Sequence, residues 1–263
     1  MKDILTEIVA WKHVEVERQK REVPSYQLYA RVEELLSESS SQRSMRNALA
    51  NSRSGIIAEF KRKSPSKGWI HAEASPADIV PQYEKAGAAA LSILTDEKYF
   101  GGSMDFIPLV RPLVETPILR KDFIVDEYQL FQACAMGADA VLLIAAALSP
   151  AVCATLARRA HDLGLEVLLE LHTLEELDYV TENMDMVGVN NRNLGTFHTD
   201  VENSFRLAKC LPHGPLLVSE SGISRPEAIR QLREAGFQGF LIGETFMREP
   251  SPAKALRQFI EAI

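Results

Sequence analysis

Residues 140–171 read AVLLIAAALSPAVCATLARRAHDLGLEVLLEL and contain two apolar runs separated by a helical pattern. The first run covers Ala140–Ala145 and the second covers Glu166–Leu171, and both are rich in the branched apolar residues typical of fully buried strands. Between them, Ser149-Pro150 is a typical helix start and Gly164 is a typical helix end. The stretch therefore predicts a strand, a helix and a second strand, arranged as a parallel βαβ unit.

The same unit recurs along the chain. Six further apolar runs of similar length are Gly55–Phe60, Ala89–Leu94, Pro117–Leu119, Met186–Asn190, Pro215–Ser219 and Gly239–Ile242. Between the runs, helix starts are indicated by Ser75-Pro76, by Thr173 with Glu176, and by Ser224-Arg225-Pro226-Glu227. Helix ends are indicated by Gly87, Gly137 and Gly236. Eight such units predict an α/β protein with a closed (β/α)8 TIM barrel. A doubly wound open sheet is the alternative, and the lack of a G-x-G-x-x-G after the first run disfavours it.

The first 50 residues precede the first predicted strand and carry a helical spacing of their own. Apolar residues recur at Ile4, Leu5, Ile8 and Val9, and again at Val32, Leu35 and Leu36. We therefore expect one barrel domain over residues 1–263, with residues 1–50 forming extra helices that are interrupted by a serine-rich break at 37–44. A helical plug over one barrel end is the favoured role of these helices, and a lid that touches substrate is the alternative.

Composition excludes several classes of protein. The 263 residues are 46% hydrophobic and 25% charged, which is typical of a globular domain. With 36 acidic and 29 basic residues the net charge is −7, which disfavours nucleic acid and anionic lipid as partners. The start shows no signal-peptide pattern and no apolar run approaches the length of a membrane span. We expect a cytoplasmic protein with reduced cysteines, for which a monomer is compatible with the sequence.

Charged and polar residues follow the predicted strands at the end where a parallel barrel builds its site. These residues are Glu59 and Lys61, Lys121, Glu170, Asn190 and Arg192, and Glu220 with Ser221. We expect them to converge on one pocket, although ion pairs that only stabilise the rim are the alternative for any single residue. The six histidines show no metal-ligand spacing, so we expect no metal site, and His172 is interpreted as structural.

The last two strands end in glycine-containing loops, Ser219-Glu220-Ser221-Gly222 and Ile242-Gly243-Glu244-Thr245. Glycines at these two positions predict a phosphate site built from backbone N–H groups, although ordinary turns are the alternative. The basic stretch at residues 61–68 is too short and too poor in aromatic residues for nucleic acid. We interpret it as a cationic loop for a small substrate that carries carboxylate or phosphate.

Five segments together resemble the indole-3-glycerol phosphate synthase family. They are IAEFKRKSPS at 57–66, LRKDFI at 119–124, LE at 169–170, GVNNRNL at 188–194 and SESGI at 219–223. The resemblance implies a (β/α)8 enzyme of tryptophan biosynthesis. Such an enzyme converts 1-(2-carboxyphenylamino)-1-deoxyribulose 5-phosphate to indole-3-glycerol phosphate, with release of carbon dioxide and water.

The resemblance also implies roles for individual residues. Catalytic positions match Glu59, Lys61, Lys121 as general acid, Glu170, Asn190 and Glu220; substrate-binding positions match Ser64, Phe100, Phe123, Leu142, Arg192 and Ser221; phosphate-binding positions match Gly222, Gly243 and Glu244. Thr245 stands where the family often has serine, and this difference leaves the backbone N–H groups of the loop unaffected.

For the reaction we expect Lys121 to donate a proton to the substrate carbonyl oxygen, with its pKa lowered by the neighbouring cation Lys61 and by partial desolvation. Lys61 would pair with the substrate carboxylate, Glu59 would hold both lysines, and Glu170 would act as the base in dehydration. Ring closure forms a cyclic iminium that accepts the electrons left by carbon dioxide, so no cofactor is implied. The alternatives are a phosphate-binding barrel isomerase and a barrel that binds a sugar phosphate without turnover.

Overall fold

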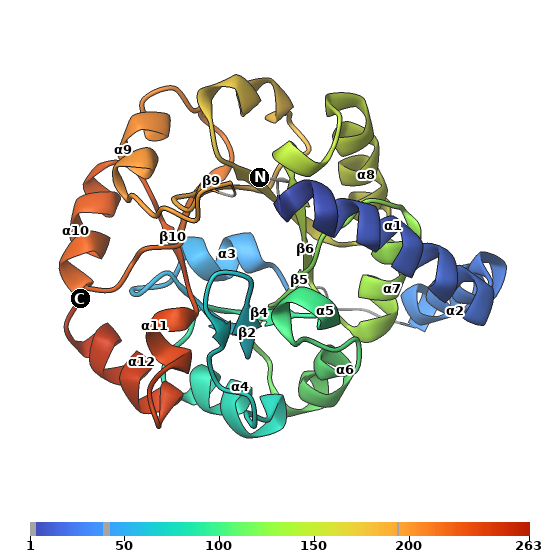
Figure 1. Cartoon of the computed structure of the whole chain (residues 1–263), viewed down its shortest axis with the longest axis horizontal. Coiled ribbons are helices and arrows are strands. Elements are labelled where there is room, and N and C mark those ends of the chain that lie inside the picture. Colours follow the sequence, from blue (N-terminus) through green and yellow to red (C-terminus); the bar gives the residue numbers. More distant parts are fainter. Residues whose placement is uncertain (1–3, 39–42, 194) are drawn as a thin grey trace.

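The computed structural model describes residues 4–38, 43–193 and 195–263 and contains a closed barrel of parallel strands (Figure 1). The barrel strands, in chain order, are β1 (Ile56–Phe60), β4 (Ala90–Leu94), β5 (Ile118–Lys121), β6 (Ala140–Ile144), β7 (Glu166–Leu171), β8 (Met186–Asn190), β9 (Leu216–Glu220) and β10 (Gly239–Ile242). Each strand pairs with its neighbour in the chain, and β1 closes the ring by pairing with β10. The predicted (β/α)8 barrel is therefore confirmed, and each predicted strand lies within two residues of an observed one.

Helices surround the barrel and follow the strands in sequence (Figure 1). Their bounds are α4 (Pro76–Lys85), α5 (Glu97–Phe100), α6 (Phe106–Val110), α7 (Tyr128–Met136), α8 (Pro150–Asp162), α9 (Glu202–Ala208), α10 (Pro226–Glu234), α11 (Glu244–Met247) and α12 (Pro252–Glu261), with 3-10 helices η1 (Arg111–Leu113), η2 (Ala145–Ala147) and η3 (Leu174–Tyr179). A short hairpin of β2 (Lys63–Ser64) and β3 (Gly68–Trp69) follows β1. The signals around α8 are confirmed, because the Ser149 hydroxyl accepts a hydrogen bond from the Val152 N–H.

The helix predicted to start at Thr173 is present, and it is a 3-10 helix. Thr173 and Glu176 do form the expected capping box, but the segment from Leu174 to Tyr179 is a 3-10 helix. The β-branched residues Val180 and Thr181 follow it directly, and β8 begins at Met186. The β-branched residues disfavour an α-helix, and the connection to β8 is short. The segment therefore forms a short 3-10 helix.

Side chains of each strand alternate between the barrel interior and the surrounding helices, as the pleat requires. On β5, Leu119 belongs to the interior cluster of apolar residues, whereas Ile118 packs in the layer between sheet and helices. The next two residues continue the alternation, so Arg120 faces outward and Lys121 faces the interior. This register decides which polar residues at the strand ends reach the site.

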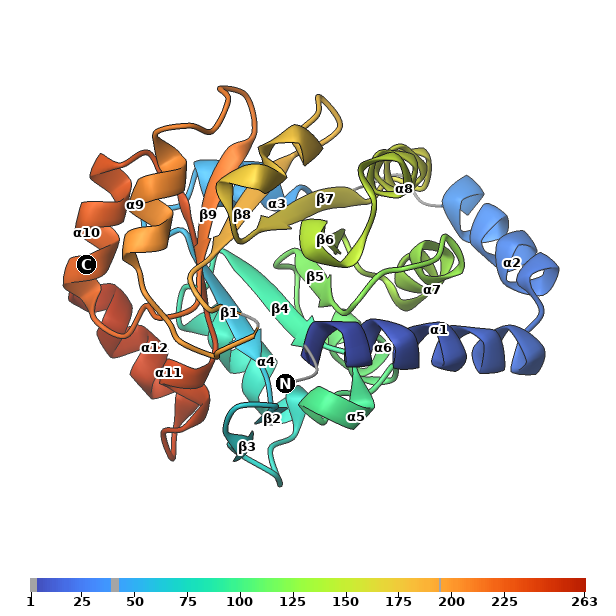
Figure 2. The same ribbon diagram turned by 45° about the horizontal axis from the view of Figure 1, so that its top comes forward.

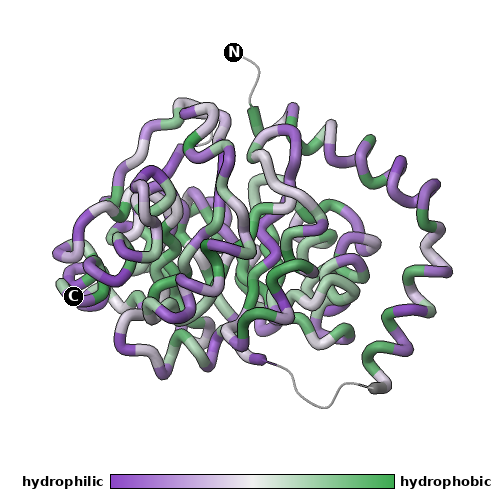
Figure 3. The backbone as a smooth tube through the Cα atoms, turned by 90° about the horizontal axis from the view of Figure 1, so that it is seen from below, coloured by the Kyte–Doolittle hydropathy of each residue, from purple (hydrophilic) through white to green (hydrophobic). Residues whose placement is uncertain are grey.

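The N-terminal segment forms the expected extra helices, α1 (Ile4–Glu22), α2 (Ser25–Glu38) and α3 (Met45–Ala50). Helix α1 lies at the end of the barrel where the strands finish, and α2 runs beside α7 toward the opposite end (Figures 2 and 3). Helix α3 closes that opposite end, because Met45 and Leu49 are buried within the interior cluster. Residues 39–42 of the predicted serine-rich break, and Leu194 of the quoted motif, lie outside the described residues.

The position of α3 agrees with the predicted plug, and contact of α1 with substrate stays a prediction. Helix α3 fills the end of the barrel where the strands begin, while α1 lies at the end where they finish. Within the three described ranges, no helix has the length and apolar character needed to cross a membrane.

Candidate active site

The carboxyl ends of the barrel strands surround a cavity of about 490 Å³, here called the mouth pocket. Its lining includes every residue that the sequence predicted for the site: Glu59, Lys61, Ser64, Phe100, Lys121, Phe123, Leu142, Glu170, Asn190, Arg192, Glu220, Ser221, Gly222, Gly243 and Glu244. These residues are spread over most of the chain, and closure of the barrel gathers them. The structure therefore brings the predicted residues to one pocket, while their individual roles stay predictions.

At the centre of the mouth pocket lies an inner charge cluster made of Glu59, Lys61, Lys121, Glu170 and Glu220. The Lys121 Nζ donates hydrogen bonds to Glu170 Oε2 at 2.9 Å and to Glu220 Oε2 at 2.8 Å. The Lys61 Nζ donates to Glu59 Oε1 at 2.5 Å. The two lysines thus have different carboxylate partners.

The environment of Lys121 corrects the expectation that its pKa is lowered. Burial alone would lower the pKa of this ammonium, but the carboxylates of Glu170, Glu220 and Glu59 outweigh burial and raise it. Lys61 is occupied by Glu59 and does not act on Lys121 as an unpaired cation. Lys121 therefore remains protonated in the free protein, and any transfer of its proton requires a basic acceptor.

The two glutamates that share Lys121 differ in their pKa values. For Glu220, burial and the neighbouring Glu170 charge raise the pKa to about 7. For Glu170, burial acts in the same direction, but Lys121 and His172 outweigh it and hold the pKa well below its ordinary value. One carboxylate is therefore ionised and the other is able to exchange a proton near neutral pH, a combination typical of acid–base sites.

Asn190 and His172 hold the opposite oxygen of Glu170. The Asn190 Nδ2 donates to Glu170 Oε1 at 3.1 Å, and the His172 Nε2 lies 3.3 Å from the same oxygen. The sequence predicts a structural histidine at position 172, but the ring lies at the edge of the inner charge cluster. Its position two residues after Glu170, in phase with the interior face of β7, is the signal that could have found it.

Two glycines make room for the carboxylates of the cluster. A methyl group on the Gly188 Cα would overlap Glu220 Oε1, and one on the Gly243 Cα would overlap Glu59 Oε1. The sequence predicts Gly243 in a phosphate loop, and the structure shows that Gly243 also leaves space for the Glu59 carboxylate. Glycine at these two interior positions allows large acidic side chains to fit inside a packed barrel.

One side of the mouth pocket is apolar. The rings of Phe100 and Phe123 lie with centroids 5.9 Å apart, and Leu142 extends this surface. Helix α1 contributes Ile4, Leu5 and Ile8 to the same lining, which the sequence did not predict. The sequence favours a plug for the N-terminal helices and keeps a lid as the alternative, and it does not say which of their residues reach the mouth, because that position depends on tertiary structure.

The other side is polar and lies at the loops after β9 and β10. Ser221 and Gly222 have left-handed backbone, with φ of 67° and 78°. The Arg192 Nη1 donates to Ser66 Oγ at 2.9 Å, and its Nη2 lies 3.4 Å from Glu244 Oε2. Two further cations line this side, Lys67 and Arg248, and Arg248 was missed because it follows a helix and not a strand.

Three kinds of comparison place the chain among known proteins. The indole-3-glycerol phosphate synthase family matches residues 5–259. The indole-3-glycerol phosphate synthase of Bacteroides thetaiotaomicron is 63% identical over the whole of both chains, and that of Paracidovorax citrulli is 41% identical over 97% of this chain and 98% of its own.

Solved structures share the barrel at low identity. Tryptophan synthase subunit alpha from Legionella pneumophila has a TM-score of 0.62 and 16% identity, over 85% of this chain and 100% of that one. The 3-hexulose-6-phosphate synthase from Salmonella typhimurium has a TM-score of 0.62 and 13% identity, over 79% and 97%. These two matches show the fold alone. From the family match and the two relatives, this chain belongs to the indole-3-glycerol phosphate synthases, the decarboxylating lyases of tryptophan biosynthesis.

Proposed function

We propose that the mouth pocket binds 1-(2-carboxyphenylamino)-1-deoxyribulose 5-phosphate and that its inner charge cluster carries out ring closure, decarboxylation and dehydration. The observation that carries the proposal is Lys121, a buried ammonium held between Glu170 and Glu220 inside the pocket. A charge group of this kind supplies both an acid and a base within reach of one substrate. The apolar side suits the aromatic ring, and the polar side suits the phosphate.

In ring closure, the aryl carbon that bears the carboxylate attacks the substrate ketone carbon, and the carbonyl oxygen gains negative charge. Lys121 donates a hydrogen bond to that oxygen and transfers its proton as the alkoxide forms. The raised pKa of Lys121 is compatible with this step, because an alkoxide is more basic than a lysine amine. Glu220, with a pKa near 7, supplies the proton that restores the ammonium.

Closure leaves a cyclic iminium, and loss of carbon dioxide returns the electron pair of the broken carbon–carbon bond to that iminium. Lys61, moved from Glu59, pairs with the substrate carboxylate before it leaves. In dehydration, Glu170 removes the ring proton while Lys61 or Lys121 protonates the departing hydroxyl. Asn190 keeps Glu170 oriented through its hydrogen bond to Oε1. The ionised state of Glu170 supports its role as the base.

We assign phosphate binding to the loops after β9 and β10. Gly222 and Gly243 allow backbone N–H groups to approach an oxyanion closely, and Ser221 adds a hydroxyl. Arg192, Lys67 and Arg248 supply positive charge in an acidic chain. Ser64 lies in the hairpin after β1, where we expect it to contact the substrate.

The test is conversion of the carboxyphenylamino substrate by purified protein, followed by the fluorescence of the indole product and compared with heat-treated protein. The proposal expects turnover. An isomerase or a sugar-phosphate binder would give no indole. The isomerase alternative would use a cysteine and an aspartate at strand ends, and it is further disfavoured because no cysteine lies among the described residues that line the mouth pocket.

A second measurement tests the division of labour within the cluster. Single-turnover experiments with Glu170→Gln are expected to show substrate consumed at a nearly normal rate and indole formed slowly. Equal slowing of both phases would contradict the assignment of Glu170 to dehydration.

Finally, we propose that the chain folds as one domain and acts in the cytoplasm, because a biosynthetic enzyme meets its phosphorylated substrate there.

A further inference from the structure

We propose that Lys12 is a positioning residue for this enzyme: its buried ammonium fixes α1 as a wall of the mouth pocket and fixes the two loops that present Phe100 and Phe123. The inference rests on the proposed function, because it concerns how tightly the pocket holds the aromatic part of the substrate. Lys12 itself does not line the pocket. It lies one to two turns beyond Leu5 and Ile8 on the same buried face of α1.

Lys12 sits where an apolar residue is expected. The buried residues of α1 are Leu5, Ile8, Lys12 and Val16, so the lysine occupies a position in the middle of an apolar stripe. Its side chain is only 3% exposed. Burial of an ammonium is unfavourable unless it is paired, and a buried ion pair is often no more stabilising than apolar packing. A lysine at this position therefore calls for a reason other than stability.

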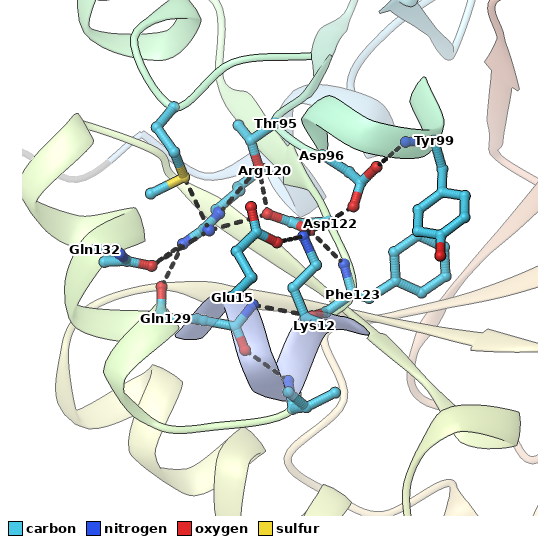
Figure 4. Close-up of polar contacts among 12 residues, drawn as sticks. Lys12, Glu15, Thr95, Asp96, Tyr99, Arg120, Asp122, Phe123, Gln129 and Gln132 are labelled. Atoms are coloured by element: carbon cyan, nitrogen blue, oxygen red, sulfur yellow. Dashed lines mark hydrogen bonds and ion pairs between the residues drawn. The ribbon is translucent and has the colours of Figure 1, made fainter. Parts of the chain in front are cut away.

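Three carboxylates surround the ammonium (Figure 4). The Lys12 Nζ lies 2.6 Å from Glu15 Oε2, 2.9 Å from Asp96 Oδ2 and 2.9 Å from Asp122 Oδ1. Burial would lower the pKa of Lys12, but Asp122, Asp96 and Glu15 outweigh burial and raise it. With Arg120, which pairs with Asp122 at 3.0 Å, these residues form an outer charge cluster between α1 and the sheet.

Each aspartate that holds Lys12 also fixes the backbone next to an aromatic residue of the pocket (Figure 4). Asp96 Oδ1 accepts a hydrogen bond from the Tyr99 N–H at 2.8 Å and so caps α5, which ends in Phe100. Asp122 Oδ1 accepts from the Phe123 N–H at 2.8 Å. One ammonium is therefore connected to both aromatic positions, and through α1 to the apolar residues of that helix that line the same pocket.

Loss of the ammonium would leave two buried aspartates close together without their shared cation. Repulsion between them would shift the loops and the part of α1 that packs on them, so the apolar side of the pocket would lose its shape. The inner charge cluster would change little, because its residues are held from inside the barrel by each other. The effect is therefore expected on KM and not on kcat.

The experiment measures kcat and KM for the carboxyphenylamino substrate in wild type, Lys12→Met and Lys20→Met. Lys20 is a matched control, because it also joins α1 to the barrel, through an ion pair with Asp126 at 2.7 Å, but it is solvent-accessible and far along the helix from the pocket. Lys12→Met is expected to raise KM about 10- to 100-fold with kcat within about threefold, whereas Lys20→Met leaves both within about twofold.

A purely structural Lys12 would lower the midpoint temperature of unfolding without moving KM, and that result in a folded Lys12→Met protein would overturn the proposal. If Lys12→Met does not fold, Asp96→Asn decides, because its amide oxygen can still cap α5 while one ion pair is lost. A raised KM in Asp96→Asn supports the proposal and an unchanged KM contradicts it. Failure of the proposed function is distinguishable, because wild type would then form no indole.

Discussion

Arg120 and Lys121 are neighbours on β5, yet they belong to two charge clusters with different character. Arg120 faces the helices and donates hydrogen bonds to the Gln129 carbonyl at 2.6 Å and to Asp122 Oδ2 at 3.0 Å. Lys121 faces the mouth pocket with two glutamates. One cation is surrounded by protein on all sides, and the other lies beside a cavity of about 490 Å³.

The difference between the clusters shows how a structural group of charges is told from a reactive one. In the outer charge cluster, Asp122 is held fully ionised, because Lys12 and Arg120 outweigh the effect of burial and lower its pKa. In the inner charge cluster, burial and the Glu170 charge raise the pKa of Glu220 to about 7, and this residue lines the mouth pocket. A carboxyl group that can exchange a proton near neutral pH beside a cavity is typical of a reactive site.

Lys121→Ala should give the largest difference in kcat between a change in the inner charge cluster and a change in the outer one. Removal of the general acid is expected to lower kcat by up to about 10⁴-fold, because ring closure then lacks the proton donor assigned to the carbonyl oxygen. Substrate binding, measured by calorimetry, should remain within about threefold. Turnover close to wild type would refute the acid assignment and would make the inner charge cluster structural.

Arg120→Met is the counterpart on the other face of β5. Asp122 would lose one of its two cations in a fully buried place, and we expect the free energy of unfolding to fall by about 3–5 kcal/mol. Urea titration measures this loss. The kcat of the folded variant should stay within about threefold of wild type. A large loss of kcat at unchanged stability would erase the distinction between the clusters.

Much of this contrast could be predicted from the sequence because strands have a period of two. Glu59, Lys121 and Glu220 stand two residues after Ile57, Leu119 and Val218, which all face the barrel interior. Strand ends and alternation therefore place the predicted catalytic residues in one pocket. They do not say which lysine meets which glutamate, because the stagger of the strands around the barrel decides that.

The same limit explains two errors. The sequence predicts a lowered pKa for Lys121, because alternation along a strand does not assign the partners of Lys61 and Lys121 across the barrel. Lys12 was missed because a lysine in a helix normally faces solvent, and only the docking of α1 brings Asp96 and Asp122 to it. Long-range contacts, and not local propensity, carry this information.

Gly188→Ala sharpens the comparison through packing alone. The new methyl group would displace the Glu220 carboxylate from Lys121, and we expect kcat to fall about 10- to 100-fold, measured by the fluorescence assay. Gly239→Ala is the matched control, because its methyl group would meet Val218 at the opposite end of the barrel interior. That variant should lose about 1–3 kcal/mol of stability with kcat unchanged. Equal losses of kcat would show that general strain, and not Glu220, is responsible.

The smallest expected effect concerns His172, which faces Glu170, Glu176 and Glu220 at the edge of the inner charge cluster. Burial would lower the pKa of this imidazole, but the hydrogen bond and charge of Glu170 outweigh burial and raise it above 6.5. The stabilisation is therefore fully present below pH 6.5 and lost as the pH rises through the raised value.

His172→Gln should cost about 1–2 kcal/mol in the free energy of unfolding at pH 5.5 and clearly less at pH 9, as measured by urea titration. It should also raise the pKa of Glu170 and move the acidic limb of the kcat profile to higher pH, because the base loses a neighbouring cation. His161→Gln is the control, since His161 pairs with Asp185 at 2.8 Å on the surface, away from the mouth pocket. The pH profile of kcat should therefore move in His172→Gln and not in His161→Gln, because only a ring that acts on Glu170 can shift the ionisation of that base. A profile that moves equally in both variants, or in neither, would show that His172 does not act on the inner charge cluster.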